Sequence, residues 1–380
     1  MNNASKDITL KIEGWRGVSH SYALVNQFQI LALMKADLAH IQHVDIPFIL
    51  PHWGVGQNPA GLNQADEKLL SELSDQGSPS CIYKIYAPLE LKAEPTLPTV
   101  TFVVTELGLD TDRHPPGFAQ QYADMGGKIH TPSEWSKQRL ICNGMPEHMI
   151  HVIPHAADRA YFFTLPTSDI ELNRNNLGLH PDDVVLLNVG THHWNKGLDM
   201  LLKSFVKARQ INPRLKLVLK DQQTTYLMDS KSYINEIIGE YIAKDDQLIH
   251  AIKLISGHLN LAQLNTLYNI ADAYVSPYRA EGFNLPALEA QTCGTPVVAT
   301  RGGATDDFLQ GSQYHPIHGQ LIENNFIKEH LPINAYIEPD LGHLTEVLSS
   351  FDRKQYTAQM NPGFQWVDAC QELMKLMSFR

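Results

Sequence analysis

Two glutamates, Glu281 and Glu289, are separated by seven residues that include a glycine and a proline. The apolar run at residues 273–275 predicts a buried strand before them, and Pro286 suits a helix start because its missing N–H costs nothing there. Carboxylates accept hydrogen bonds from hydroxyls, and the free amides of a helix start attract phosphate. The pattern therefore suits a ligand that carries both groups, such as a sugar nucleotide.

The two acids divide the expected work between them, one holding a sugar ring and the other a ribose. Four residues after Glu281 would lay their backbone against a phosphate: Gly282, Phe283, Asn284 and Leu285. A helix dipole alone also favours acids near a helix start, so solvated carboxylates are the competing interpretation. The surrounding sequence has to decide between the two.

Two lysines follow predicted strands. Gly190 and Thr191 come directly after the apolar run at residues 184–189, and Lys196 ends this loop before a striped helix. A parallel sheet places phosphate-binding loops at such positions, so we expect Lys196 to face a diphosphate. Lys220 follows the run at residues 215–219 and could add a second positive charge to the same pocket.

Further candidates are weaker and rest on position alone. The turn with Gly14, Arg16 and Gly17 follows the first predicted strand, where Arg16 could contact phosphate or an acceptor, or be simple surface charge. Gly257 and His258 follow the strand expected at residues 248–255 and could contact a nucleotide base.

The sequence gives little support to a metal site. Asp110 and Asp112 form a pair with one residue between them, a spacing that can hold a divalent cation, but the following Arg-His-Pro-Pro-Gly indicates an ordinary turn. His192 and His193 are adjacent and would not point at one ion. The four scattered cysteines form no CxxC pair. We therefore expect no metal and no cofactor.

Composition limits the partners. The chain has 380 residues, is 43% hydrophobic and carries a formal net charge of −11, which argues against nucleic acid as the main partner. The N-terminus lacks the apolar core of a signal peptide, and no run of eighteen apolar residues occurs. We expect a cytoplasmic protein, and nothing supports association with a membrane, although a peripheral position at an inner membrane face stays open.

The fold class follows from alternating strand and helix patterns. Strands are expected at residues 8–12, 46–50, 100–104, 184–189, 215–219, 248–255, 273–276 and 297–299, and helices at residues 23–36 and 198–206. This rhythm predicts α/β architecture with parallel, doubly wound sheets. Residues 51–98 are rich in Pro, Gly and Ser and should form loops, while residues 166–168 mark a linker between two domains.

The sequence resembles the retaining glycosyltransferases of family 4. The segment E-G-F-N-L-P-A-L-E-A at residues 281–290, followed by C-G-T-P-V-V-A-T, is similar to the family's strongest signature. The Lys-Gly loop at residues 190–197 and the Ala-Asp and Ser-Pro pairs at residues 271–277 are similar too. In the first half, T-P-S-E-W-S from Thr131 and V-I-P-H-A-A-D from Val152 look like the family's crossing between domains.

This resemblance implies the GT-B fold, two Rossmann-like doubly wound domains facing across a cleft. The acceptor-side domain would span residues 1–168 and regain a returning helix at about 363–380, and the nucleotide-sugar domain would span 180–360. The resemblance implies that Glu281 contacts the transferred sugar, Glu289 the ribose, and Lys196 the diphosphate. Thr191 departs from the family, which often has arginine there, so Lys220 is our candidate replacement. Glu106, which follows the strand expected at residues 100–104, and the nearby His114 are the candidates for a first-domain catalytic group.

The reaction implied is transfer of a sugar from a UDP- or GDP-sugar to a hydroxyl of a glycan, a lipid-linked or another acceptor, with retained configuration. A 2-epimerase or phosphorylase on the same fold is the alternative among enzymes. A nicotinamide oxidoreductase is disfavoured because no proper glycine fingerprint follows the first strand. A non-catalytic glycan-binding subunit is the third class.

Overall fold

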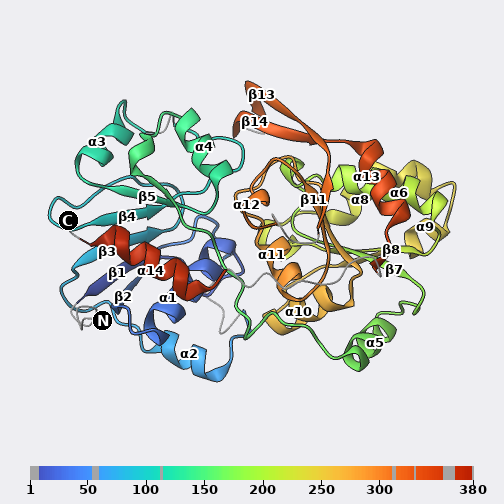
Figure 1. Cartoon of the computed structure of the whole chain (residues 1–380), viewed down its shortest axis with the longest axis horizontal. Helices are drawn as coiled ribbons and strands as arrows, with labels where there is room; N and C mark the ends of the chain where they lie inside the picture. Colours follow the sequence, from blue (N-terminus) through green and yellow to red (C-terminus); the bar gives the residue numbers. More distant parts are fainter. Residues whose placement is uncertain are drawn as a thin grey trace. The chain divides into compact units, whose positions relative to one another are not determined.

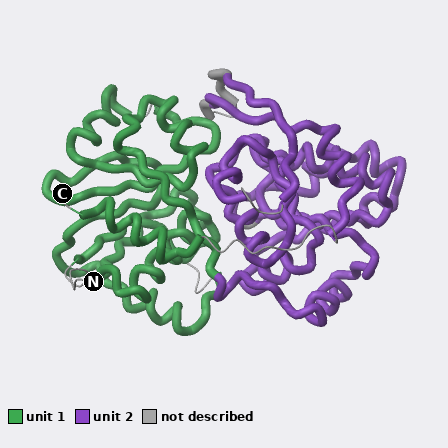
Figure 2. The backbone as a smooth tube through the Cα atoms, in the orientation of Figure 1, with its two compact units in different colours: residues 1–158, 327–332, 363–380 green, residues 159–326, 333–362 purple. Residues whose placement is uncertain are grey.

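The computed structural model describes residues 8–53, 60–111, 114–309, 314–328, 331–353 and 364–378. The chain divides into two compact units (Figure 2). Unit 1 comprises residues 1–158, 327–332 and 363–380, and unit 2 comprises residues 159–326 and 333–362. Residues 159–168, which the sequence analysis placed in the first domain, thus belong to unit 2.

Unit 1 is built on a six-stranded parallel sheet with the order β2-β1-β3-β4-β5-β6. The strands are β1 (Thr9–Gly14), β2 (His40–Asp45), β3 (Cys81–Ile85), β4 (Thr99–Phe102), β5 (Lys128–Thr131) and β6 (Ile150–Val152). β1 leads to β2 on one side and the chain then crosses to β3 on the other. The strand order therefore reverses between β1 and β3.

The helices of unit 1 include one from the end of the sequence (Figure 1). They are α1 (Ser21–Lys35), α2 (Gln64–Ser71), α3 (Phe118–Asp124), α4 (Glu134–Cys142) and α14 (Trp366–Met377). The ring of Trp366 stacks on Phe28 of α1 with centroids 5.8 Å apart, and Lys128 Nζ donates to the Leu376 carbonyl at 2.6 Å. A cation at the last carbonyls of a helix is favoured by the dipole, so α14 is fixed at both ends.

Unit 2 repeats this architecture with the strand order β12-β11-β10-β7-β8-β9, again parallel. Its strands are β7 (Val184–Val189), β8 (Leu215–Lys220), β9 (Ile252–Ile255), β10 (Ala273–Ser276), β11 (Val297–Thr300) and β12 (Tyr314–Ile317). The order reverses between β7 and β10. Two α/β units with parallel sheets confirm the predicted fold class.

Helices cover the sheet of unit 2. They are α5 (Thr167–Asn176), α6 (Leu198–Ile211), α7 (Gln223–Tyr226), α8 (Ser230–Ile242), α9 (Gln247–His250), α10 (Leu261–Ile270), α11 (Leu285–Thr292), α12 (Asp306–Leu309) and α13 (Leu341–Ser350). The apolar stripe of α6 is buried: Leu201, Leu202 and Phe205 are each 0% exposed, in one core with Leu217 and Val275. The 3.6-residue period of this helix is what the sequence shows.

Several expected elements are corrected by the structure. Residues 46–50 form no strand, and β2 lies just before them. Residues 51–98 contain α2 and β3 besides loops, and residues 248–255 are divided between α9 and β9. The expected linker at residues 166–168 starts α5. A long hairpin of β13 (Gly319–Lys328) and β14 (Leu331–Pro339) was not anticipated.

In the described part of the chain, no helix combines the length and apolar character needed to cross a membrane.

Candidate functional site

The loops after β7 and β10 lie on either side of the point where the strand order of unit 2 reverses. Open α/β sheets bind ligands outside the carboxyl ends of their strands at such a point. Lys196 follows β7, and Glu281 follows β10. Lys196 Nζ donates to Glu281 Oε2 at 2.8 Å, with side chains 24% and 12% exposed. The structure thus joins two residues that are 85 positions apart in the sequence.

Gly197 fixes the turn that carries Lys196. Its φ is 70°, and an added Cβ would lie 1.8 Å from the Pro277 carbonyl oxygen. Only glycine allows the turn to approach the backbone after β10 so closely. The backbone amides of Arg279 and Ala280 both donate to the Asn195 carbonyl, at 2.7 and 3.2 Å. The two loops are therefore one packed unit.

The buried side chain of Arg279 links these loops to neighbouring elements by hydrogen bonds. Its guanidinium is 4% exposed, makes two hydrogen bonds to Asp199 at 2.8 and 2.9 Å, and two to Glu338 at 2.8 and 3.0 Å. It also donates to the Trp194 carbonyl at 2.9 Å and lies 4.9 Å from the centre of the Trp194 ring. Burial would raise the pKa of Asp199, but the hydrogen bonds and charge of Arg279 lower it below its usual value. Arg279 thereby ties the Lys196 loop, α6 and β14 to the Glu281 loop.

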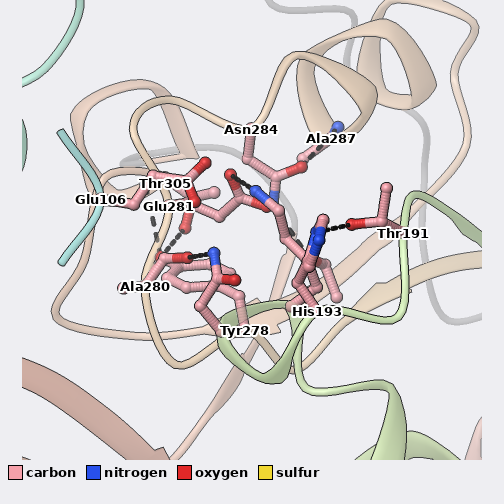
Figure 3. A network of polar contacts seen from close by, with 12 residues as sticks. Glu106, Thr191, His193, Tyr278, Ala280, Glu281, Asn284, Ala287 and Thr305 are labelled. Carbon is pink, nitrogen blue, oxygen red and sulfur yellow. Dashed lines mark hydrogen bonds and ion pairs between the residues drawn. The ribbon is translucent and has the colours of Figure 1, made fainter. Parts of the chain in front are cut away.

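Asn284 starts α11 (Figure 3). Its φ of 73° is in the left-handed region, which Asn tolerates better than most residues. Asn284 Oδ1 accepts from the Ala287 amide at 3.4 Å, and Asn284 Nδ2 donates to Ser276 Oγ at 2.9 Å. Gly282 and Phe283 are buried between Glu281 and this cap, with the Phe283 ring 5.0 Å from Phe308. Residues 282–285 thus lead into a helix start, as the sequence predicts.

Glu289 lies deeper than expected. It is the fifth residue of α11 rather than part of the first turn, and it is 8% exposed. Tyr268 of α10 donates its phenol hydrogen to Glu289 Oε2 at 2.6 Å. Burial raises the pKa of Glu289 to about 7, and the hydrogen bond from Tyr268 acts in the opposite direction. Glu289 therefore exchanges its proton near neutral pH.

Gly190 and Thr191 line the loop after β7. The Gly190 amide donates to the Lys220 carbonyl at 3.0 Å, and a Cβ on Gly190 would meet nothing within 4 Å. Thr191 Oγ1 and His193 Nδ1 share a hydrogen bond of 2.8 Å (Figure 3). The His192 ring instead stacks on Tyr233, with centroids 4.6 Å apart. The structure therefore gives the two histidines separate partners.

Lys220 is buried at the end of β8 and is 7% exposed. Its ammonium donates to the Asp221 carbonyl, and burial lowers its pKa while the Asp221 carboxylate opposes that effect. Asp221 Oδ2 accepts from Ser256 Oγ at 2.8 Å, beside Gly257, whose φ is 98°. Gly257 and the adjoining His258 thus follow β9, the strand next to β8. Lys220 and these residues line the carboxyl ends of two adjacent strands.

The N-terminal candidates belong to unit 1. Arg16 Nε and Nη2 donate to the two carboxylate oxygens of Asp45 at 2.8 and 2.9 Å, and Nη1 donates to the Leu70 carbonyl at 2.9 Å. Gly17 has a φ of 71° and donates its amide to Gln27 Oε1. A Cβ on Gly14 would lie 2.8 Å from Asn26 Nδ2. Arg16 therefore has a structural role, which the sequence did not indicate.

Glu106 and His114 both lie in the connection between β4 and α3 of unit 1, with different partners. The Glu106 carbonyl accepts from Trp135 Nε1 at 2.8 Å, while His114 stacks on Phe118 at 4.4 Å. Asp112 lies outside the described residues, which leaves the Asp110 pair untested. Among the described residues, no group of three or more His, Cys, Asp or Glu is placed to hold a metal ion.

Sequence reasoning missed Arg279, Asp199, Glu338 and Tyr268. Arg279 stands two residues before Glu281, and Asp199 three residues after Lys196, so opposite charges at matching places in two strand-to-helix loops could have indicated a pair. Glu338 comes from the unforeseen hairpin, and no local pattern connects Tyr268 with Glu289.

Residues 169–330 match the family model described as Glycosyl transferases group 1. Over these residues the chain is similar to that family. The matched stretch includes Lys196, Glu281 and Glu289, and it spans less than half of the 380 residues.

Curated relatives match over part of their length. The chain is 29% identical over 161 residues to the D-inositol 3-phosphate glycosyltransferase of Segniliparus rotundus, covering 40% of this chain and 32% of that protein. It is 25% identical over 194 residues to the lipopolysaccharide 1,2-N-acetylglucosaminetransferase of Salmonella typhimurium, covering 50% and 49%. The chain spans about a third to a half of the length of these relatives.

The fold has solved counterparts over almost the whole chain. The structure of Anabaena HepE in complex with UDP-glucose matches with a TM-score of 0.62 at 16% identity, covering 97% of this chain and 98% of HepE. The pneumococcal O-GlcNAc transferase GtfA, solved with UDP and GlcNAc, matches with a TM-score of 0.59 at 11% identity. At these identities the likeness shows the fold, which is that of the GT-B structures.

Proposed function

We propose that the chain is a glycosyltransferase that moves a sugar from a nucleotide-diphosphate sugar to an acceptor hydroxyl, with retention of configuration and without a metal ion. The observation that carries this proposal is the Lys196–Glu281 pair, 2.8 Å long, between the loops after β7 and β10. The pair provides a cation and a carboxylate that can accept hydrogen bonds from sugar hydroxyls, at the place where parallel sheets bind ligands.

The first support is chemical. When the bond between the sugar and the diphosphate breaks, negative charge accumulates on the leaving phosphate. Groups fixed in advance at that position lower the barrier because their contacts strengthen as the charge develops. Lys196 and the amides at the start of α11 supply such groups, and Asn284 together with Gly197 fixes their position. Lys220 is a second cation that would stabilise the negative charge of the leaving diphosphate.

The donor is a UDP- or GDP-sugar in this proposal. HepE was solved with UDP-glucose and GtfA with UDP, and both share the fold. Glu281 holds hydroxyls of the transferred sugar, and Glu289 holds the ribose. The acceptor is a hydroxyl of a glycan, a lipid-linked molecule or another compound, contacted by unit 1. The charge on the leaving group is balanced by Lys196 and backbone amides, which is why we propose no metal.

The test is release of nucleotide diphosphate from a panel of UDP- and GDP-sugars, measured with and without EDTA. We expect one donor to be cleaved slowly with water and faster with its acceptor, at the same rate with EDTA. Product anomers read by NMR should keep the donor configuration. Lys137→Ala is the matched control for Lys196→Ala, because Lys137 also forms an ion pair with a glutamate, Glu147, at 3.2 Å, but in unit 1.

The outcomes separate the parts of the proposal. No cleavage of any donor would overturn the activity, and loss of activity on chelation would overturn metal independence and bring Asp110 back into consideration. An inverted anomer would exclude retention. Cleavage that requires inorganic phosphate would indicate a phosphorylase instead.

A further inference from the structure

The Glu289 carboxylate is held by a phenol from another helix. Tyr268 is 0% exposed and Glu289 8% exposed, and their oxygens are 2.6 Å apart. A hydrogen bond of this length between a hydroxyl and a carboxylate is of the charge-assisted kind, which is stronger than a neutral one. This hydrogen bond therefore holds one oxygen of the Glu289 carboxylate in place and so sets the orientation of the carboxylate.

Neighbouring residues hold both the backbone and the ring of Tyr268. α10 begins with a capping box between Asn260 and Gln263, and Thr295 Oγ1 donates to the Tyr268 carbonyl at 2.6 Å. The Tyr268 ring meets Phe162 and Tyr274 edge to face, with centroids 6.1 and 6.2 Å apart. The phenol is consequently a rigid donor rather than an adaptable one.

The groups around Glu289 do not neutralise its charge. In the part of the chain that the structure describes, the Glu289 carboxylate affects the pKa of Tyr268 of α10, Tyr274 of β10 and Cys293, the residue after α11, while its own pKa responds to burial and to the Tyr268 hydrogen bond. Burial raises the pKa of each of these three groups, so all stay neutral at physiological pH. The phenol of Tyr268 thus stabilises the ionised form of Glu289 without a cation.

We propose that Tyr268 is a positioning residue that aims the ionised Glu289 carboxylate at a ribose hydroxyl of the nucleotide. This inference rests on the proposed function and deepens it, because it names what sets discrimination for ribose over deoxyribose. Without the phenol, the carboxylate would be protonated to higher pH and free to rotate. Either change weakens the hydrogen bond that the Glu289 carboxylate accepts from the ribose hydroxyl.

The experiment is calorimetric titration of the full chain with UDP and GDP and with their 2′-deoxy and 3′-deoxy forms. We expect wild type to bind one ribonucleotide more tightly than one of its deoxy forms. Tyr268→Phe should weaken binding of that ribonucleotide about tenfold, the scale of a hydrogen bond to a charged group. For the deoxy form that lacks the contacted hydroxyl, the same variant should change affinity by less than about twofold.

The pH profile gives a second readout that a merely structural tyrosine would not move. Wild type should gain affinity for the ribonucleotide as pH rises through about 7, where Glu289 ionises. In Tyr268→Phe this rise should shift to higher pH because the stabilising hydrogen bond is gone. Tyr122→Phe, which removes a buried phenol bonded to Thr101 Oγ1 at 2.8 Å in unit 1, is the matched control.

The failures are distinguishable. If wild type binds no nucleotide at all, the proposed function fails. If wild type binds but Tyr268→Phe loses the same factor with the ribonucleotide and both deoxy forms, or loses nothing, the positioning role is overturned. Should the variant not fold, wild type alone decides: a ribose-to-deoxyribose preference that stays constant between pH 6 and 8.5 contradicts the inference.

Discussion

The two units share one architecture, a six-stranded parallel sheet whose strand order reverses beside its first strand, but they carry different residues at that reversal. In unit 2 the carboxyl ends at the reversal between β7 and β10 carry Lys196 and Glu281, next to the ion pairs of the buried Arg279 side chain. In unit 1 the loop after β1 carries Trp15, whose ring lies 5.3 Å from His20 and 5.6 Å from Trp53. A parallel sheet with a reversed strand order therefore provides a place for a ligand but does not specify its chemistry.

The arginines sharpen this difference. Arg279 is 4% exposed and has carboxylates from two elements, whereas Arg16 is 26% exposed beside Asp45, which is 55% exposed. Buried ion pairs cost much to break, and exposed ones contribute little. In unit 2 a buried arginine thus bridges two carboxylates next to the candidate site, whereas the pair after β1 in unit 1 is more exposed.

The largest expected effect is on turnover. Lys196→Ala should lower donor cleavage about 100- to 1,000-fold, because one fixed charge-stabilising group is removed from the leaving phosphate. Release of nucleotide diphosphate under saturating donor measures it. Lys137→Ala in unit 1 should keep the wild-type rate, and equal losses in both variants would show that the effect is not local to the β7 loop.

The next effect is on stability and separates the two arginines. Arg279→Met should lower the free energy of unfolding by about 3 kcal/mol, because the largely buried Asp199 carboxylate loses both of its hydrogen bonds from Arg279. Arg16→Met should cost about 1 kcal/mol or less. Urea unfolding followed by tryptophan fluorescence gives both values, and similar losses would contradict the contrast between the units.

A smaller effect distinguishes two glycines that share a backbone conformation. Gly197 and Gly144 both have positive φ, at 70° and 82°, but only at Gly197 would a Cβ meet the Pro277 carbonyl. Gly197→Ala should destabilise by about 2 kcal/mol more than Gly144→Ala, since overpacking adds to the shared backbone strain. Thermal unfolding of both variants tests this, and equal shifts would mean that the two loops of unit 2 are not tightly packed.

The smallest effect concerns pH and has opposite signs in the two units. The pKa of Glu289 is raised to about 7, so its contribution to stability is present below pH 4.5 and lost as pH rises to about 7. Burial lowers the pKa of His20 and His130 in unit 1 to about 4, so their contribution is present above pH 6.5 and lost as pH falls to about 4.

Glu289→Gln isolates the unit 2 term. This variant should gain stability relative to wild type as pH rises from 5 to 8, because the wild-type carboxyl ionises in a buried site and glutamine cannot. Thermal midpoints at both pH values measure the difference. A difference between variant and wild type that is independent of pH would contradict the assigned ionisation of Glu289.

Local patterns predicted much of the fold. The stripe of α6 and the apolar runs of β7, β8, β10 and β11 are periodic signals read from neighbouring residues, and they place Lys196 and Glu281 after strands. The strand predicted at residues 46–50 is wrong because an apolar run need not be a strand. β3 was not predicted because it is short, buried on both faces and lies within a stretch rich in Pro and Gly.

The site was predictable only where its members belong to such local patterns. Arg279 acts through Glu338, which lies on the β13–β14 hairpin 59 residues later, and Tyr268 acts through Glu289, 21 residues later. These pairs form only when the fold packs distant segments together, as α10 against α11 for Tyr268 and Glu289, and no periodicity in the chain records them. The same holds for Arg16, whose two hydrogen bonds to Asp45 could not be read from the sequence.

The central claim is that unit 2, at the reversal between β7 and β10, holds the nucleotide. A crystal structure of the chain soaked with UDP and, in parallel, GDP tests it most directly. We predict diphosphate density within hydrogen-bond reach of Lys196 and of the amides at the start of α11, with the ribose beside Glu289. A nucleotide bound instead at the end of β1 in unit 1 would contradict the account.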